Sequence, residues 1–401
     1  MKGRGVHLGN GSCSATDVLS AVAEFFAGRA ARVGNRQSRV LGAPLRLKLT
    51  AAAVLSVLAC ATVTTLESVA HAQAPALAAS AAPVPPLPLA SPARVRRQRL
   101  AAVTSWRYQL RRIDIAEVAA SAADLVVIDY APDRVYGVEL PFTREDVARM
   151  QRKPDGRTRI VLAYLSIGEA ERYRTYWNNA WYDAPTRPEW LLAPNPQWDG
   201  NFPVRFWHPN WQAIVFGTAE AYLDRILAAG FDGVYLDRAD VYQELVAERP
   251  GAEDDMAHFI VSLAQHARTQ KRDALFVMQN AEELVRRRAV RHAIDAVAKE
   301  DLLNGVNHDE KPNPQEMVRD TLADLTLARK AGRAILVVEY LSNASAAQHA
   351  VSRIKSYGYL PLIAERSLGT LEFKPARSST AGTDGKPLAR SGNARRGSAA
   401  R

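Results

Sequence analysis

The feature that most constrains the fold of this chain is a regular alternation of two apolar patterns between residues 100 and 373. One pattern is a short run of consecutive apolar residues, which is typical of a strand buried on both faces. The other places apolar residues three and four apart, as at Met256, Phe259, Ile260 and Leu263, and predicts an amphipathic helix. Strands that alternate with helices favour right-handed βαβ units and a parallel sheet.

Eight apolar runs in this region are predicted to be strands. They are Tyr108–Leu110, Leu125–Asp129, Ile160–Leu165, Gly233–Leu236, Leu275–Gln279, Ala296–Lys299, Ile335–Tyr340 and Leu360–Ala364. Eight strands in about 270 residues fit a single (β/α)8 TIM barrel of the α/β class, which usually takes about 250 residues. A doubly wound open sheet is the alternative. No glycine-rich phosphate-binding motif follows the first run, so nothing indicates a nucleotide site.

The first 72 residues are predicted to be an N-terminal extension that ends in a secretory signal peptide. Arg46 and Lys48 precede an apolar run from Leu49 to Val63, and Ala70-His71-Ala72 resembles a cleavage site. Cleavage near Ala72 makes the mature protein periplasmic or secreted. An uncleaved anchor is one alternative, although the apolar run is shorter than the about 20 residues of a spanning helix. A lipoprotein site at Cys60 is another.

Two further segments lack the apolar residues that a core needs. Residues 73–99 are rich in alanine and proline and end in an arginine run, and we expect them to form a semi-rigid linker. Residues 374–401 are rich in Ser, Gly, Ala and Arg, and we expect this basic tail to be disordered. Weak attachment of the tail to an anionic envelope polymer is the alternative. The barrel domain is thus predicted to span residues 100–373.

The net charge of +10 at pH 7 does not belong to the predicted domain. Between residues 100 and 372, 33 Lys and Arg stand against 38 Asp and Glu, so the flanks carry the excess of bases. We therefore expect no nucleic-acid partner and, apart from export, no membrane contact. Both cysteines, Cys13 and Cys60, precede the domain, which excludes a cysteine nucleophile from it. The eight histidines show no ligand spacing, so neither a metal nor another cofactor is expected.

Polar or acidic residues stand at or near the C-terminal end of every predicted strand. In a (β/α)8 barrel these ends share the face on which active sites are built. Asp237 and Glu300 directly end apolar runs and are the candidate catalytic residues. Neighbouring carboxylates raise one another's pKa, which suits acid–base chemistry. The candidates for substrate contact at the other strand ends are Gln109, Asp129, Tyr164, Glu169, Asn280, Glu339 and Tyr340.

Aromatic side chains are concentrated after the third predicted strand. Eleven aromatic residues and six prolines lie between Tyr173 and Trp211, which indicates a long, proline-braced loop. Such loops in compact domains are usually functional, and aromatic faces fit the C–H surfaces of sugar rings. Tyr173, Trp207 and Trp211 are therefore candidates for saccharide contact. A packed lid that touches no ligand is the alternative.

Five segments together resemble glycoside hydrolase family 114. They are Trp106–Leu110, Val127–Tyr130, Tyr164–Glu171, Phe206–Trp211 and Phe231–Asp237. The resemblance covers residues 105–368 and implies a secreted endo-α-1,4-polygalactosaminidase on a (β/α)8 barrel. It implies a nucleophile at Asp237 and an acid/base at Glu300, while Glu339-Tyr340 stands where an Asp-Tyr pair is expected. Relatives have also been labelled cysteinyl-tRNA synthetase-like, but no signature of that enzyme class occurs.

These observations predict an exported glycosidase that cleaves an α-linked, galactosamine-containing polysaccharide. In a retaining mechanism Asp237 attacks the anomeric carbon while Glu300 protonates the leaving oxygen. A cationic amino-sugar polymer suits an acidic cavity. We expect a monomer. The alternatives are a glycosidase for another envelope or biofilm polysaccharide and a non-catalytic saccharide-binding barrel, and Glu169, Glu339 and Asp129 are the alternatives to Glu300 as the acid.

Overall fold

The computed structural model describes residues 91–132, 140–307 and 309–376. The expected signal peptide, its cleavage site and both cysteines lie outside these residues, as do most of the expected linker and tail. Within these ranges no helix combines the length and the apolar character needed to cross a membrane.

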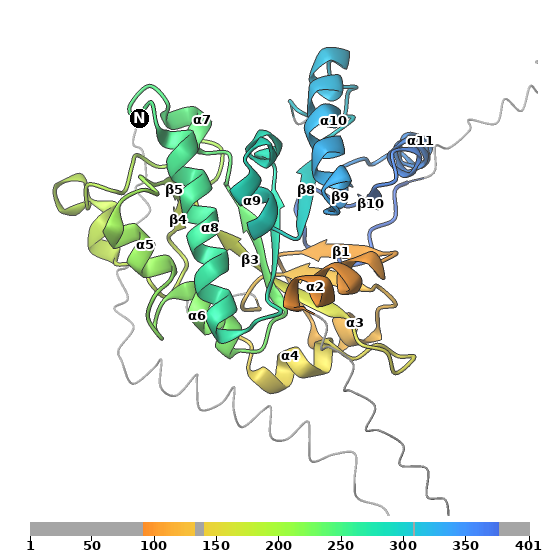
Figure 1. Cartoon of the computed structure of the whole chain (residues 1–401), viewed down its shortest axis with the longest axis horizontal. Coiled ribbons are helices and arrows are strands. Elements are labelled where there is room, and N and C mark those ends of the chain that lie inside the picture. Colours follow the sequence, from red (N-terminus) through yellow and green to blue (C-terminus); the bar gives the residue numbers. More distant parts are fainter. Residues whose placement is uncertain (1–90, 133–139, 308, 377–401) are drawn as a thin grey trace, which may run out of the picture. The chain divides into compact units, whose positions relative to one another are not determined.

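All eight predicted strands are confirmed, and they form one sheet in the order β1-β2-β3-β6-β7-β8-β9-β10 (Figure 1). Their bounds are β1 Trp106–Gln109, β2 Leu125–Ile128, β3 Ile160–Ser166, β6 Gly233–Asp237, β7 Leu275–Gln279, β8 Ala296–Glu300, β9 Ala334–Glu339 and β10 Leu360–Ile363. Neighbouring strands run parallel. The indole nitrogen of Trp106 donates to the carbonyl of Leu360 at 3.0 Å, so β1 and β10 nearly close the sheet into a (β/α)8 barrel.

Helix α2 (Pro92–Ala101) precedes the first strand, and the other helices lie between or after the strands along the chain. These are α3 Ile115–Ala120, α4 Arg144–Met150, α5 Pro209–Val215, α6 Tyr222–Ala228, α7 Tyr242–Leu245, α8 Ala252–Gln270, α9 Arg288–Ala293, α10 Gln315–Lys330 and α11 Ala344–Ser356, with short 3-10 helices at η1 Asn179–Tyr182, η2 Ala184–Thr186 and η3 Glu282–Arg286. Helix α8 buries the predicted apolar stripe that includes Met256 and Leu263. Its first turn carries three acids, which the helix dipole favours.

Alternate side chains of the strands fill two cores. One core lies inside the barrel and includes Tyr108, Tyr235 and Val277. The other lies between the sheet and the helices and includes Phe276 and Leu263. Inside the barrel, the ring centroids of Tyr108 and Tyr235 are 5.0 Å apart. This packing fixes the Tyr235 ring below the ends of the strands that carry the site.

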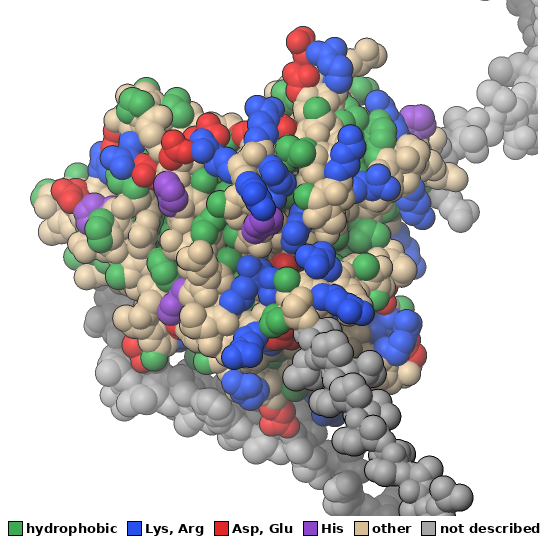
Figure 2. All heavy atoms as spheres, in the orientation of Figure 1, with side chains coloured by type: hydrophobic (Ala, Val, Ile, Leu, Met, Phe, Trp, Pro, Cys, Tyr) green, Lys and Arg blue, Asp and Glu red, His purple; other side chains and the backbone are tan. Residues whose placement is uncertain are grey.

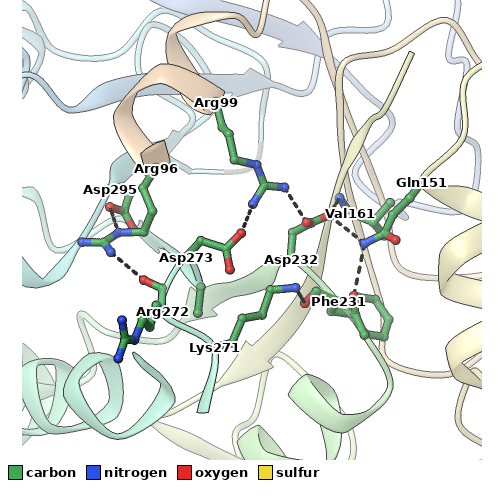
Figure 3. Close-up of polar contacts among 12 residues, drawn as sticks. Arg96, Arg99, Gln151, Val161, Phe231, Asp232, Lys271, Arg272, Asp273 and Asp295 are labelled. Atoms are coloured by element: carbon green, nitrogen blue, oxygen red, sulfur yellow. Dashed lines mark hydrogen bonds and ion pairs between the residues drawn. The ribbon is translucent and has the colours of Figure 1, made fainter. Parts of the chain in front are cut away.

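Helix α2 corrects the predicted linker, because residues 92–99 belong to the barrel (Figure 3). Arg96 is buried and pairs with Asp295 at 2.9 Å, and Arg99 pairs with Asp232 and, at 3.2 Å, with Asp273. The three aspartates directly precede or closely precede β8, β6 and β7, so α2 lies at the N-terminal end of the barrel. The arginine run was expected to end a linker, but Arg96 and Arg99 pair with aspartates that are remote in sequence. The domain therefore starts near Pro92 instead of Leu100.

The predicted C-terminal boundary at residue 373 also falls slightly short. The backbone of Ala376 donates to the carbonyl of Ser342 at 2.8 Å, and its own carbonyl accepts from Ala344 at 2.9 Å. Ala376 therefore pairs with the segment that starts α11, and residues 377–401 lie outside the described ranges.

The segment after β3 was predicted to be one long loop. The structure shows a packed substructure instead. Strands β4 (Glu169–Glu171) and β5 (Asn201–Pro203) form a two-stranded antiparallel sheet. Most of the aromatic residues pack on one another: Trp190 lies 5.1 Å from Trp181 and 5.4 Å from Trp211 between ring centroids. The aromatic density therefore serves mainly to build this segment.

Basic side chains are spread over one face of the domain, around α2, α9 and α10 (Figure 2). They gather there although acids outnumber bases between residues 100 and 372. Nine of the acids instead line a cavity at the C-terminal ends of the strands. Net charge alone does not reveal this separation.

Candidate active site

A cavity of about 1000 Å³ opens at the C-terminal ends of the barrel strands. Nine carboxylate side chains and five basic side chains line it. This is the face on which the strand topology gathers the predicted residues. Eight of them line the cavity: Asp129, Tyr164, Glu169, Tyr173, Asp237, Asn280, Glu300 and Tyr340.

Asp237 and Glu300, at the ends of β6 and β8, share one hydrogen-bond donor. The side-chain nitrogen of Gln279, which ends the intervening strand β7, donates to Asp237 Oδ1 at 2.7 Å and to Glu300 Oε2 at 3.2 Å. The two carboxylate oxygens therefore lie no farther apart than the sum of these distances. Gln279 in turn accepts from the hydroxyl of the buried Tyr235 at 2.5 Å, which directs its nitrogen towards the carboxylates.

The second oxygen of each carboxylate accepts a tyrosine hydroxyl. Tyr164 donates to Asp237 Oδ2 at 2.7 Å, and Tyr340 donates to Glu300 Oε1. The guanidinium carbon of Arg366 lies 4.4 Å from the centroid of the Tyr340 ring and packs on its face. Each carboxylate is thus fixed in orientation through both of its oxygens, as a reacting group requires.

Burial raises the pKa values of both carboxyl groups. Burial, assisted by the nearby Glu300, raises the pKa of Asp237 to about 7, although the Tyr164 hydrogen bond opposes the shift. Burial raises the pKa of Glu300 as well, against the opposing hydrogen bond from Tyr340. Groups this close titrate as a pair. The raised pKa values let the pair keep a proton at higher pH than ordinary carboxyl groups do, and one shared proton is the state that one nucleophile and one acid need.

Asn280 holds neighbouring chain atoms in addition to lining the cavity. Its φ of 54° is left-handed, which asparagine tolerates better than most residues. Its side-chain oxygen accepts from the backbone nitrogen of Glu300 and from Lys299 Nζ, both at 3.2 Å. Asn280 therefore also holds the end of β8 in place.

One wall of the cavity is a buried ion-pair cluster around Arg174. Its Nη1 lies 2.6 Å from Asp129 Oδ1, and its Nε lies 2.6 Å from Glu171 Oε2. Tyr173 donates to the other oxygen of Glu171. Burial raises the pKa of Glu171, and the arginine opposes that shift. The predicted candidates Asp129 and Tyr173 are thus held rigidly within this cluster.

Four predicted substrate contacts lie outside the cavity lining, which corrects those assignments. Trp211 is fully buried and donates from its indole to the carbonyl of Ile167 at 3.0 Å. Trp207 packs against Phe206, with Arg249 over its ring. Both tryptophans therefore agree with the alternative interpretation of this segment, a packed lid whose aromatic side chains contact one another and no ligand.

The other two corrected residues are buried polar groups that hold backbone. Gln109 donates from its amide to the carbonyls of Arg111, Arg112 and Gly369 at 3.0–3.3 Å. Glu339 has no exposed surface and accepts from the backbone nitrogens of Leu303 at 2.7 Å and Asn304 at 3.1 Å. Burial raises the pKa of Glu339 to about 7. It fixes the loop after β8 and, being out of reach, does not compete with Glu300 as the acid.

Gln279 and Trp198 are among the cavity residues that sequence reasoning missed. Gln279 was counted only as a strand residue, although its position at a strand end is the same signal that marked the acids. Trp198 is the tryptophan that lines the cavity among the described residues, and 45% of its surface is exposed. Within the described ranges, no group of three or more His, Cys, Asp and Glu side chains is arranged to hold a metal ion.

The chain matches the family model of glycoside-hydrolase family GH114 over residues 88–380. It belongs to glycoside-hydrolase family GH114. The match starts before α2 and extends beyond Ala376, in agreement with the wider domain bounds that the structure gives. A GH114 chain is a glycosidase, and a pair of carboxylates in a cavity suits the hydrolysis of a glycosidic bond.

Two curated relatives and one solved structure are similar to most of the domain. An uncharacterised protein of Deinococcus radiodurans is 35% identical over 288 residues, covering 71% of this chain and 87% of the relative. An uncharacterised protein of Methanocaldococcus jannaschii is 33% identical over 276 residues, covering 65% and 75%. The glycoside hydrolase domain of PelA from Pseudomonas aeruginosa superposes with a TM-score of 0.51 at 21% identity, over 67% of this chain and 98% of that domain. At this identity the likeness shows the fold.

Proposed function

We propose that this chain is a retaining glycosidase in which Asp237 is the nucleophile and Glu300 is the acid/base. The observation that carries the proposal is the single nitrogen of Gln279 that contacts both carboxylates. The contacts bound the distance between Asp237 Oδ1 and Glu300 Oε2, and this bound is compatible with the about 5–5.5 Å that separates the carboxyl groups of retaining enzymes.

In the first step Glu300 gives its proton to the glycosidic oxygen while an oxygen of Asp237 bonds to the anomeric carbon. The leaving sugar departs with that proton, and an ester joins the remaining sugar to Asp237. In the second step Glu300, now ionised, takes a proton from water, whose oxygen displaces Asp237. Burial raises the pKa of Glu300, which is the direction that a proton donor needs.

We propose an α-linked polysaccharide that contains galactosamine as the substrate. The support is the excess of carboxylates over basic groups in the cavity, which favours a cationic amino sugar. A glycosidase for another envelope polysaccharide is the second candidate, because other amino sugars carry the same charge. We also propose export with cleavage near Ala72, and N-terminal sequencing of the protein from an envelope fraction tests it. An intact N-terminus on cytoplasmic protein would contradict export.

Release of reducing ends from an α-1,4-linked galactosamine polymer tests the function directly. We expect the intact chain to cleave it and both Asp237→Asn and Glu300→Gln to lose nearly all activity. Glu220→Gln, an exposed acid outside the cavity, is the matched control and should keep full activity. Azide should rescue the two inactive variants with opposite anomers of the glycosyl azide, because it replaces the nucleophile in one and the water in the other. Binding of the polymer without any cleavage would favour the non-catalytic alternative.

A further inference from the structure

Trp198 differs from the other tryptophans in both exposure and position. Trp106, Trp190 and Trp211 are buried, and Trp177, Trp181 and Trp207 pack against neighbouring aromatic rings. Trp198 leaves 45% of its surface exposed, and in the described part of the chain it is the tryptophan that lines the catalytic cavity. A large apolar side chain left exposed beside a polar cavity is a feature of ligand-binding sites.

The loop that carries Trp198 is held closed at its base. The backbone nitrogen of Asn195 donates to the carbonyl of Asn201 at 2.8 Å, and that of Asn201 donates to the carbonyl of Trp198 at 3.1 Å. Gly200 supplies the left-handed turn, with a φ of 87°. The chain from Asn195 to Asn201 is therefore a compact turn that fixes the backbone of Trp198.

Both asparagines of this turn are clamped by one buried carboxylate. Asn195 donates to Glu169 Oε1 at 2.8 Å, and Asn201 donates to Glu169 Oε2 at 3.0 Å. Glu169 is 1% exposed, so these bonds are shielded from water. The predicted substrate contact Glu169 thus has both oxygens occupied by the turn.

Glu169 also ties the turn to the strand end that carries the nucleophile. Arg238 Nε lies 3.0 Å from Glu169 Oε1. Arg238 directly follows Asp237 and has a left-handed φ of 56°, which turns the backbone away from β6. The path from Trp198 through Glu169 and Arg238 to Asp237 therefore consists of buried or hydrogen-bonded groups at fixed positions.

We infer that Trp198 is a stacking platform for one sugar ring of the polysaccharide and that Glu169 is the residue that positions it. The indole face packs on the C–H face of a pyranose ring, and Gln197 and Asn201 beside it line the cavity with polar groups for the hydroxyl or amino substituents. The inference rests on the proposed function, because it names a binding subsite for the same polymer.

The experiment measures binding of the α-1,4-linked galactosamine polymer by calorimetric titration in the Asp237→Asn background, where no cleavage occurs. We expect Trp198→Ala to weaken binding by about tenfold or more, a scale set by aromatic stacking on flat ligands. Trp198→Phe, which keeps an aromatic face, should restore most of the affinity. Tyr182→Ala is the matched control, because Tyr182 is an exposed aromatic of the same segment that does not line the cavity.

The role of Glu169 is tested on the active chain with Glu169→Gln. Its KM for the polymer should rise more than its kcat falls, because the substitution loosens the platform. Affinity that does not change in Trp198→Ala, on a chain that still cleaves the polymer, overturns the platform and leaves the chemistry intact. Trp198-dependent binding on a wild-type chain that cleaves nothing supports the platform and contradicts the proposed reaction.

Discussion

The side-chain nitrogen of Gln279 lies 2.7 Å from Asp237 Oδ1, and the same nitrogen also donates to Glu300. The hydroxyl of Tyr235, inside the barrel core, holds the amide oxygen and so fixes the direction of this donor. A neutral residue thus sets the separation and orientation of the two acids. This arrangement explains how two carboxylates can be held close together in a buried site through a donor that carries no charge.

Replacing Gln279 by methionine keeps the side-chain length and removes the shared donor. Donors to an ionised carboxylate lower its pKa, so Gln279→Met should move the acidic limb of the kcat/KM profile to higher pH. We expect kcat to fall about tenfold or more, since the reacting oxygens lose their orientation. Tyr235→Phe leaves the amide in place and should cause a smaller change in the same direction. An unchanged pH profile in Gln279→Met would show that Gln279 does not position the two carboxylates.

The strands could be predicted because a strand that is buried on both faces needs an unbroken apolar run. All four residues of Leu125–Ile128 are buried, and so are all five of Leu275–Gln279. Once eight such runs alternate with helices, topology places the residues that follow them on one face. Asp237 and Glu300 could therefore be predicted to meet without any knowledge of side-chain packing.

The choice among tryptophans could not be predicted, because it depends on tertiary packing. Trp198 and Trp211 lie in the same proline-rich segment, yet one faces the cavity and the other is the centre of the packed substructure. Local sequence gives both the same signal. The role of Arg96 could not be predicted for a related reason: its partner Asp295 is 199 residues away, so local sequence placed the arginine run in the linker.

Asp237→Asn should stabilise the fold, and more so at high pH. The pKa of Asp237 is about 7 in the folded chain and about 3.9 in an unfolded one, so the wild-type fold loses stability as the pH rises through this interval. The neutral amide does not titrate. Because the carboxylate partly faces the cavity, we expect a difference of about 1–3 kcal/mol at pH 8 that nearly disappears at pH 4. Urea unfolding at both pH values checks this, and a difference that grows towards low pH would contradict it.

Arg174→Met should destabilise the domain strongly. The substitution keeps most of the apolar stem and removes the cation that pairs with the carboxylates of Asp129 and Glu171. Breaking a buried pair from one side costs about 3–5 kcal/mol. Arg157→Met is the matched control, because its pair with Asp155 is exposed and should be worth less than about 1 kcal/mol. Equal losses in denaturant unfolding of the two variants would show that the Arg174 cluster contributes no more than a surface pair.

A fragment of residues 91–376 should be more stable than one of residues 100–376. The shorter fragment lacks most of α2, so Asp295 loses Arg96 and Asp232 loses Arg99 (Figure 3). Removing these partners leaves buried carboxylates poorly compensated. Thermal melts of both fragments measure the effect. Arg97→Ala in the longer fragment is the control, because Arg97 is exposed on the same helix. Equal melting temperatures of the two fragments would show that α2 does not stabilise the barrel and is part of the linker.

The most direct test of the account is the anomeric configuration of the first product, followed by proton NMR during cleavage of the α-1,4-linked galactosamine polymer. The carboxylate separation permitted by Gln279 predicts a double displacement through Asp237, so the new reducing end should appear as the α-anomer and only later mutarotate. A β-anomer as the first product would mean a single displacement by water, and it would contradict both the role of Asp237 as nucleophile and the retaining mechanism.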